Sequence, residues 1–295
     1  MATTTTEVEK KTGSFKSFDG TEVYYEVRGK GKPIVMAYGI GCPMNHWIHQ
    51  VRHFSHHYQT ILFDYRGHGG TPVPDDKENL SLDAIATDVK CLLDHLKIEK
   101  ASLWGHSFGA QVLFRVYELS PEIFSNLVLI NGFATNPIKN MFGTNIVETI
   151  FPYLQLGQQA YPSIVSKMWK MGITNPLAVP LSALAGGFNL SLTSMRDIEV
   201  YAKTIGSMDP GVFMHLFEQM MKYDAQHVLS EVKVPTLIIS GSKDGVTPGS
   251  YQDMMHDKIV GSEIQRVPYG SHCTQLDMPE FVNLRIDKFL QQNKW

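Results

Sequence analysis

The sequence predicts an α/β protein with a mostly parallel, doubly wound sheet that is interrupted by an inserted helical segment. Short apolar runs typical of buried strands alternate with amphipathic helical patterns, and this alternation is the pattern of a parallel sheet covered by helices. The alternation breaks after residue 132, and from 133 to about 223 the patterns are helical, with Pro and Gly interruptions. At 295 residues and 43% hydrophobic content, the chain can bury the core of one such domain.

The strands are expected in two groups. Segments 14–18 and 23–28 resemble an opening hairpin around Asp19-Gly20. Apolar runs that fit buried strands follow near residues 34, 60, 101, 127, 236 and 263.

Helical patterns are predicted between these strands, at 81–96, 110–119, 250–259 and 280–291. Ser81 is a suitable N-cap for the first, because its hydroxyl can accept a bond from a free N–H group of the first turn. Pro279 suits the first turn of the last, where no N–H group is needed.

Three parts of the chain are therefore expected. Residues 1–12 form a flexible polar N-terminus, residues 13–132 and 225–295 form the core, and residues 133–224 form the inserted helical segment. Within this segment, Asp209-Pro210 is a good helix start and precedes an apolar stripe. The stripe consists of Val212, Phe213, Leu216, Phe217, Met220 and Met221.

The most informative motif is Gly105-His106-Ser107-Phe108-Gly109, which lies between an expected strand and an expected helix. In a Gly-x-Ser-x-Gly turn of this kind the serine occupies a sharp bend with its hydroxyl exposed, the arrangement called a nucleophile elbow. An ordinary Gly-rich turn of a nucleotide-binding protein is the alternative.

Two partners for Ser107 follow in the expected order. Asp244 lies in the loop after the strand near 236, and His272 lies in the loop after the strand near 263. A serine hydroxyl is a weak nucleophile, a neutral imidazole can take its proton, and a carboxylate fixes the tautomer of the imidazole. The order Ser, Asp, His distinguishes this arrangement from the other well-known triad folds.

These residues resemble the α/β-hydrolase superfamily, and the resemblance extends upstream. Segment 38–41 follows a strand where the family places its oxyanion loop, and segment 64–69 is similar to the family's Asp-x-Arg-Gly-x-Gly turn. The resemblance implies an oxyanion hole made by the backbone N–H groups of Ile40 and Phe108. Tyr38 stands where the family usually has His, and we expect its side chain to support this loop.

The resemblance also implies that residues 133–224 form an inserted helical cap with a pocket beneath it, and we expect Tyr38, Phe213, Phe217 and Met220 near that pocket. Methionine and phenylalanine would make such a pocket apolar and adaptable. The chemistry requires no cofactor and no metal.

Composition excludes several classes of partner. The formal net charge of −3, with 19% charged residues, provides no basic field for nucleic acid. No apolar stretch approaches the roughly 20 residues that span a bilayer, and the N-terminal residues lack the apolar segment of a signal peptide. A cytoplasmic location is expected, with Cys42, Cys91 and Cys273 as free thiols. The oligomeric state is left open.

Histidines are concentrated in one region: His46, His49, His53, His56 and His57. The spacing of four between three of them could place them on one helix face. A metal site is one interpretation, but a solvated helix face is favoured because no carboxylate or cysteine joins the pattern. His106 adjoins Ser107 in the elbow, so its side chain should point away, and His272 is the better candidate base.

The resulting hypothesis is a serine hydrolase that cleaves a hydrophobic ester through an acyl-enzyme. Carbon-carbon bond hydrolases, thioesterases and perhydrolases of this superfamily share the same residues and remain alternatives. Epoxide hydrolases and haloalkane dehalogenases of the fold use Asp at the elbow, so Ser107 argues against them. A signalling receptor that binds a small ligand is a further alternative from a different class.

Overall fold

The computed structural model describes residues 8–173, 175, 177, 178, 180 and 187–295. Its centre is an eight-stranded sheet in the order β1-β2-β4-β3-β5-β6-β7-β8. The strands are β1 (Lys10–Lys16), β2 (Glu22–Arg28), β3 (Pro33–Ala37), β4 (Gln59–Phe63), β5 (Ala101–His106), β6 (Phe124–Ile130), β7 (Thr236–Gly241) and β8 (Glu263–Val267).

The α-helices among the described residues are α1 (Ile48–Phe54), α2 (Leu82–His95), α3 (Phe108–Leu119), α4 (Ile146–Ala160), α5 (Pro162–Ile173), α7 (Met195–Ser207), α8 (Pro210–Lys222), α9 (Gln226–Leu229), α10 (Ser250–Lys258), α11 (Thr274–Asp277) and α12 (Pro279–Gln292). Short 3₁₀ helices are η1 (Met44–Trp47), η2 (Lys77–Asn79), η3 (Pro121–Ile123) and η4 (Ile138–Gly143).

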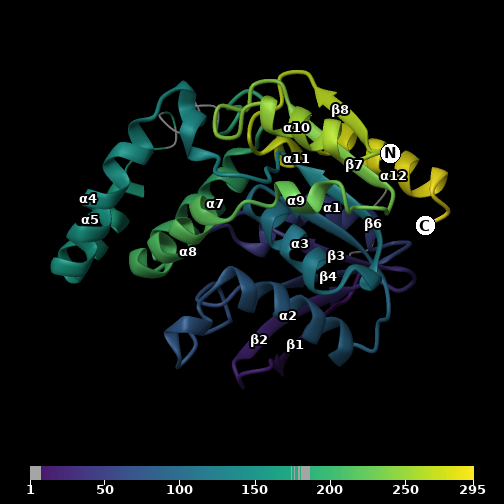
Figure 1. Cartoon of the computed structure of the whole chain (residues 1–295), viewed down its shortest axis with the longest axis horizontal. Helices are drawn as coiled ribbons and strands as arrows, with labels where there is room; N and C mark the ends of the chain where they lie inside the picture. Colours follow the sequence, from purple (N-terminus) through teal and green to yellow (C-terminus); the bar gives the residue numbers. More distant parts are fainter. Residues whose placement is uncertain (1–7, 174, 176, 179, 181–186) are drawn as a thin grey trace.

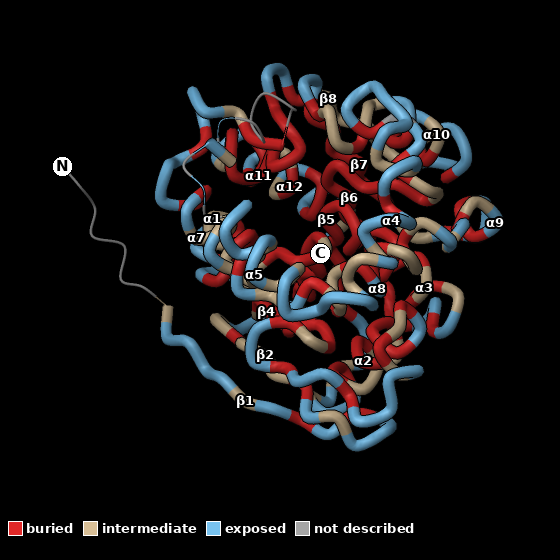
Figure 2. The backbone as a smooth tube through the Cα atoms, turned by 90° about the vertical axis from the view of Figure 1, so that its left-hand side faces the viewer, coloured by how far each residue is buried: buried red, intermediate tan, exposed pale blue. Residues whose placement is uncertain are grey.

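The sheet is mostly parallel, as the sequence predicts. Strands β4, β3, β5, β6, β7 and β8 pair in parallel along the order of the sheet, whereas β1 and β2 add an antiparallel edge. Every residue of β5 and β7 is buried, so both faces of the central sheet are covered. Figure 2 shows the buried strands at the centre and exposed backbone along β1.

The hairpin differs in its bounds from the expectation. β1 begins at Lys10, inside the stretch expected to be flexible, and ends before Ser17. Most of β1 is exposed because it is the edge strand, so its residues carry little hydrophobic pattern for a sequence to reveal. Residues 1–7 of the expected flexible terminus lie outside the described residues.

The helices begin where their capping residues indicate. Ser81 accepts a hydrogen bond from the N–H group of Ala84 at the start of α2 (3.2 Å). Asp209 accepts bonds from the N–H groups of Gly211 and Val212 at the start of α8. Both caps were predicted, and both fix the direction in which an amphipathic helix enters the fold.

Between β6 and β7 the described part of the chain is helical. Helices α4, α5, α7 and α8 lie together on one side of the sheet (Figure 1). We call the described part of residues 133–224 the helical block. Gln219 of α8 connects the block to the core, because its side-chain amide accepts a bond from the N–H group of Leu82 (2.8 Å) and donates to the carbonyl of Leu80 (3.0 Å).

The topology brings the predicted site residues to one edge. Ile40, Ser107, Asp244 and His272 each follow the carboxyl end of a parallel strand, namely β3, β5, β7 and β8. In parallel sheets these ends lie at the same edge, which is where ligands of open α/β folds bind.

Candidate active site

Ser107 lies in the sharp turn between β5 and α3. Its backbone has φ 54° and ψ −120°, a conformation that costs energy for a residue with a side chain. A Cβ atom at Gly105 would come within 2.8 Å of the Gly109 backbone, and one at Gly109 would come within 2.3 Å of the Ala37 carbonyl oxygen. Only glycine fits at either position, so the motif is explained by the close approach of strand and helix.

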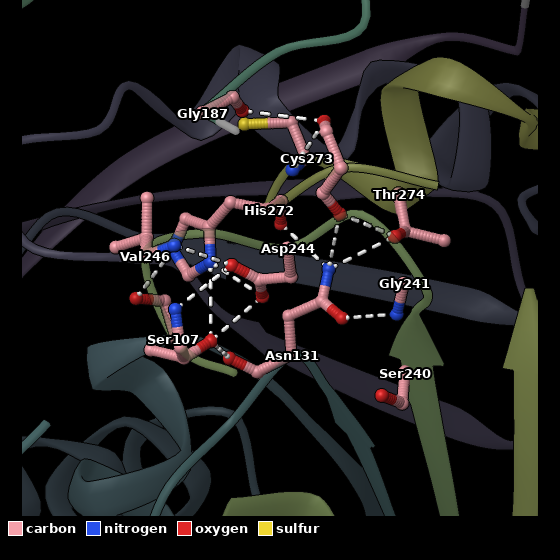
Figure 3. Close-up of polar contacts among 12 residues, drawn as sticks. Ser107, Asn131, Gly187, Ser240, Gly241, Asp244, Val246, His272, Cys273 and Thr274 are labelled. Carbon is pink, nitrogen blue, oxygen red and sulfur yellow. Dashed lines mark hydrogen bonds and ion pairs between the residues drawn. The ribbon is translucent and has the colours of Figure 1, made fainter. Parts of the chain in front are cut away.

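The structure brings Ser107, His272 and Asp244 into one hydrogen-bonded chain (Figure 3). His272 Nε2 is 3.0 Å from Ser107 Oγ, and His272 Nδ1 is 2.9 Å from Asp244 Oδ2. A carboxylate only accepts, so Nδ1 donates and Nε2 is left to accept from the serine hydroxyl. All three residues are buried, with 7 to 8% of their surface exposed.

The Asp244 carboxylate is held by its own loop. Oδ1 accepts hydrogen bonds from the N–H groups of Val246 (2.9 Å) and Thr247 (2.8 Å), and Oδ2 accepts from the Thr247 hydroxyl (2.7 Å). These three hydrogen bonds fix the direction of the carboxylate toward His272. Thr247 was not singled out from the sequence.

Asn131 is a second residue that sequence reasoning missed. It directly follows β6 and has φ 46°, a conformation that asparagine tolerates better than most residues. Its side-chain NH₂ donates to the carbonyls of Ser271 (2.9 Å) and His272 (2.7 Å), and its Oδ1 accepts from the N–H group of Gly241 (2.7 Å). Asn131 therefore connects the end of β7 to the loop that carries His272.

Of the two residues expected to supply oxyanion-hole N–H groups, Phe108 follows Ser107 in the chain and Ile40 lines the same cavity as Ser107. Phe108 is the first residue of α3, where N–H groups have no partner within the helix. Ile40 precedes Gly41, whose N–H group donates to His68 Nε2 (3.1 Å). His68 belongs to the Asp-x-Arg-Gly-x-Gly turn, so this turn braces the loop of Ile40.

Tyr38 supports the same loop through buried hydrogen bonds. Its hydroxyl donates to Asp64 Oδ1 (3.1 Å) and accepts from the N–H group of Tyr65 (2.9 Å). The Tyr65 hydroxyl in turn donates to the Tyr38 carbonyl (2.8 Å). Tyr38 is completely buried and does not line the cavity beside Ser107, so the expectation that it lies at the pocket is wrong. Its hydrogen bonds are those expected of a residue that supports the loop.

Burial shifts the pKa values of groups in this turn. Burial raises the pKa of Asp64 to about 6, although the Gly70 N–H group and the Tyr38 hydroxyl oppose the change. Burial lowers the pKa of His68 to about 4, so the His68 ring is neutral at pH 7 and can accept the bond from Gly41.

Arg66 of the same turn is fully buried, and its guanidinium forms two hydrogen bonds with the Asp88 carboxylate (2.8 and 2.7 Å).

An apolar cavity of about 230 Å³ opens beside Ser107 and His272. Phe213, Phe217 and Met220 of α8, which were expected near a pocket, are among the residues that line it. Other apolar residues of its wall include Ile40, Phe133, Met141, Phe188, Tyr201 and Ile205.

A second apolar cavity of about 280 Å³ adjoins the first. Phe188, Tyr201 and Ile205 line both cavities and so form the wall between them. The rings of Phe188 and Tyr201 meet edge to face, with centroids 5.0 Å apart.

The histidine-rich segment does not form one helix face. Helix α1 ends at Phe54, so His57 lies beyond it. His49 Nε2 is 3.0 Å from Asp197 Oδ2, and His53 Nε2 is 2.5 Å from Asp287 Oδ2. The expectation that no carboxylate joins these histidines is therefore wrong. The sequence pattern missed both carboxylates because they come from distant parts of the chain.

His106 points away from the Ser107 hydroxyl, as expected. Its Nε2 donates to the backbone carbonyl of His272 (2.9 Å). The ring stacks on that of His46, with centroids 4.5 Å apart. Burial lowers the pKa of His46 to about 3 and lowers that of His106 well below its usual value, so both rings are neutral.

All three cysteines are free thiols, as expected. Cys42 and Cys273 are buried at the wall of the first cavity, and Cys91 is partly buried. Burial raises the pKa of Cys42 to about 12 and also raises that of Cys273. Buried neutral thiols behave as small apolar groups.

Comparison with known proteins agrees with this architecture. Residues 32–279 match the family model of the α/β-hydrolase fold. The chain belongs to the α/β-hydrolase family. None of its described helices is long and apolar enough to cross a membrane.

Relatives within the family differ in their reported functions. The chain is 27% identical to Karrikin insensitive 2 receptor IA of Petunia hybrida, over 86% of this chain and 89% of that one. It is 26% identical to epoxide hydrolase 4 of Homo sapiens, over 92% and 76%. An esterase structure from Exiguobacterium antarcticum superimposes with a TM-score of 0.74 at 21% identity, over 94% and 98%.

Proposed function

We propose that this α/β-hydrolase is a serine hydrolase that cleaves a hydrophobic small-molecule ester through an acyl-enzyme. The observation that carries the proposal is the hydrogen-bonded chain from Ser107 Oγ through His272 to Asp244 Oδ2. It contains a nucleophile, a base with a free Nε2 lone pair, and a carboxylate that orients the base.

In the proposed reaction, Ser107 Oγ attacks the ester carbonyl while His272 Nε2 takes the hydroxyl proton. The N–H groups of Ile40 and Phe108 hold the negative charge that develops on the carbonyl oxygen. His272 then protonates the departing alcohol, and a water molecule repeats the sequence on the acyl-enzyme. Asp244 remains charged throughout and stabilises the imidazolium.

The cavity supports an apolar acyl or alcohol group. Its wall beside Ser107 is made mainly of aromatic and aliphatic side chains, with Phe213, Phe217 and Met220 supplied by α8. An apolar pocket with few polar groups binds through the area that it removes from water. We therefore propose medium-length or aromatic acyl groups over acetyl.

The experiment is hydrolysis of a nitrophenyl ester series from acetate to decanoate, with Ser107→Ala as the matched variant. The parent should show kcat/KM rising with acyl length and then falling, and the variant should lose activity by a factor on the order of 10⁶. A fluorophosphonate probe should label the parent at Ser107. Activity retained in Ser107→Ala, or labelling elsewhere, would contradict the proposal.

A receptor is the second candidate, favoured by the similarity to Karrikin insensitive 2 receptor IA. A receptor would bind a small ligand in the same cavity and turn it over slowly. A ligand that raises the melting temperature while the nitrophenyl esters show no turnover would favour that function. Fast turnover without a ligand-dependent partner would favour the hydrolase.

A further inference from the structure

Cys42, His46 and His106 form a buried cluster that the proposed hydrolysis does not use. One ligand atom from each of them can be chosen so that all three lie within 4.8 Å of one another. At most 4% of the surface of each residue is exposed. Cys42 and His46 lie four residues apart, in the loop after β3 and in η1, and the fold brings His106 at the end of β5 to them.

The cluster contains polar atoms that the described protein groups leave without a hydrogen bond: Nδ1 and Nε2 of His46, and Nδ1 of His106. Buried polar atoms are nearly always paired, and each exception calls for an explanation such as a bound ion. Three exceptions in one place indicate a site for a ligand.

The hydrogen bond of His106 fixes which of its atoms can bind. A carbonyl oxygen only accepts, so the bond to His272 O puts the proton of the neutral ring on Nε2. Nδ1 therefore carries a free lone pair. Metal-binding histidines characteristically donate their other N–H group to a carbonyl or carboxylate in this way.

The charge of the cluster selects the type of cation. Its ligands would be one thiolate and two neutral imidazoles, which together carry a single negative charge. A monovalent cation makes the site neutral, whereas a divalent cation leaves a buried positive charge, which is costly. Thiolate ligands favour soft cations such as Cu(I).

We infer that Cys42, His46 and His106 bind one soft monovalent cation, Cu⁺ or its redox-inert analogue Ag⁺, next to the turn that carries Ser107. On binding, Cys42 loses its thiol proton to solvent and its sulfur bonds the cation, while His106 Nδ1 and one nitrogen of His46 complete a three-coordinate site. Metal–ligand bonds of about 2.0 to 2.3 Å are compatible with three ligand atoms that lie within 4.8 Å of one another.

The cation would reach this site through the apolar cavity, because Cys42 lines that cavity. It would then lie next to the proposed catalytic residues. A Cβ atom placed on Gly39 would be 3.1 Å from Cys42 Sγ, 3.2 Å from His106 Nδ1 and 3.3 Å from Ser107 Cβ. A cation bound here would therefore lie against the loop that carries Ile40 and beside Ser107, and ester hydrolysis should fall.

The test is binding itself, measured without relying on activity. Anaerobic protein should remove one equivalent of Cu⁺ from a chromophoric Cu⁺ chelator and release one proton. Cys42→Ala and His46→Phe each remove a ligand and should weaken Cu⁺ binding by more than about 100-fold. Loss of a residue that only hydrogen-bonds to a ligand typically costs roughly 10- to 100-fold. Cys91→Ser and Cys273→Ala, which retain all three ligands, should bind like the parent.

Circular dichroism must show that both ligand variants are folded. X-ray absorption of the Cu⁺-loaded parent provides an independent measurement, because it should find one sulfur and two nitrogens around the metal. Binding that survives in folded Cys42→Ala, a two-sulfur environment, or no binding by the parent would each overturn the inference. Ag⁺ should bind like Cu⁺, and tighter binding of Zn²⁺ than of Cu⁺ would overturn the charge argument.

Discussion

The Tyr38 hydroxyl donates a hydrogen bond to the Asp64 carboxylate across 3.1 Å, and this contact joins the loop after β3 to the turn after β4. The same hydroxyl accepts a bond from the Tyr65 N–H group. One side chain therefore satisfies two buried polar groups. It holds the loop that presents Ile40 without approaching the cavity.

Tyr38→Phe should destabilise the protein and slow ester hydrolysis. The variant leaves the Tyr65 N–H group and the Asp64 carboxylate without their partner, and each buried unpaired group costs about 1 to 3 kcal/mol. Urea unfolding measures the loss of free energy, and kcat for a nitrophenyl ester measures displacement of the loop. Tyr25→Phe, which removes a more exposed hydroxyl, is the control, and equal stability of the two variants would contradict the supporting role.

Acid should destabilise the fold in part through His68. Its folded pKa of about 4 lies below the value of about 6.5 expected in the unfolded chain, so between these values the unfolded state binds the extra proton. Stability is then lost as pH falls through this window. From pH 7 to pH 5 the loss should be about 2 kcal/mol for this one group.

His68→Gln tests this contribution because it keeps an acceptor but cannot take a proton. Urea unfolding at pH 7 and pH 5 should show a smaller loss in the variant than in the parent, with exposed His57→Gln as control. Asp64 acts in the opposite direction. Because its pKa is raised to about 6 in the folded state, the folded state binds a proton that the unfolded state does not bind between about pH 6 and 4, and this stabilises the fold as pH falls. A variant as sensitive to pH as the parent would show that His68 is not the group responsible.

Asn131→Gly should lower kcat more than it changes KM. Glycine accepts the φ of 46° at no cost, so the change isolates the loss of the side-chain bonds to the His272 loop and to Gly241. Without them His272 is free to move relative to Ser107. Steady-state kinetics with a nitrophenyl ester measures the effect, and an unchanged kcat would show that the loop is positioned by its other contacts.

The strands could be predicted from sequence because most of them are buried. The apolar runs near 34, 60, 101, 127, 236 and 263 all lie in the parallel part of the sheet. The first expected strand, 14–18, begins four residues after the start of β1 because the exposed residues of β1 carry no such run. The positions of Ser107, Asp244 and His272 at the ends of strands followed from the same patterns, and their meeting at one edge follows from parallel topology.

Other features depend on contacts that no local pattern records. Asn131 is one asparagine after a strand, and only the fold places it between Gly241 and His272. The spacing of His49, His53 and His57 suggested a shared helix face, but α1 ends at Phe54. His46 instead stacks on His106, which is far from it in sequence.

Phe188→Ala should shift the preferred ester toward longer acyl chains. Phe188 forms the wall between the two apolar cavities together with Tyr201 and Ile205, and truncating its ring should open a passage through that wall. Each additional methylene that leaves water contributes about 0.8 kcal/mol, roughly fourfold in kcat/KM. The nitrophenyl ester series measures the optimum, and an unmoved optimum with lowered stability would mean that Phe188 only packs.

The proposed acyl-enzyme on Ser107 can be tested directly by quenching the parent within the first turnovers of a nitrophenyl ester and weighing the intact protein. The account predicts an added mass of one acyl group, located by peptide mapping on Ser107 and missing from Ser107→Ala. Steady hydrolysis with no added mass at any time, or an acyl group on another residue, would contradict it.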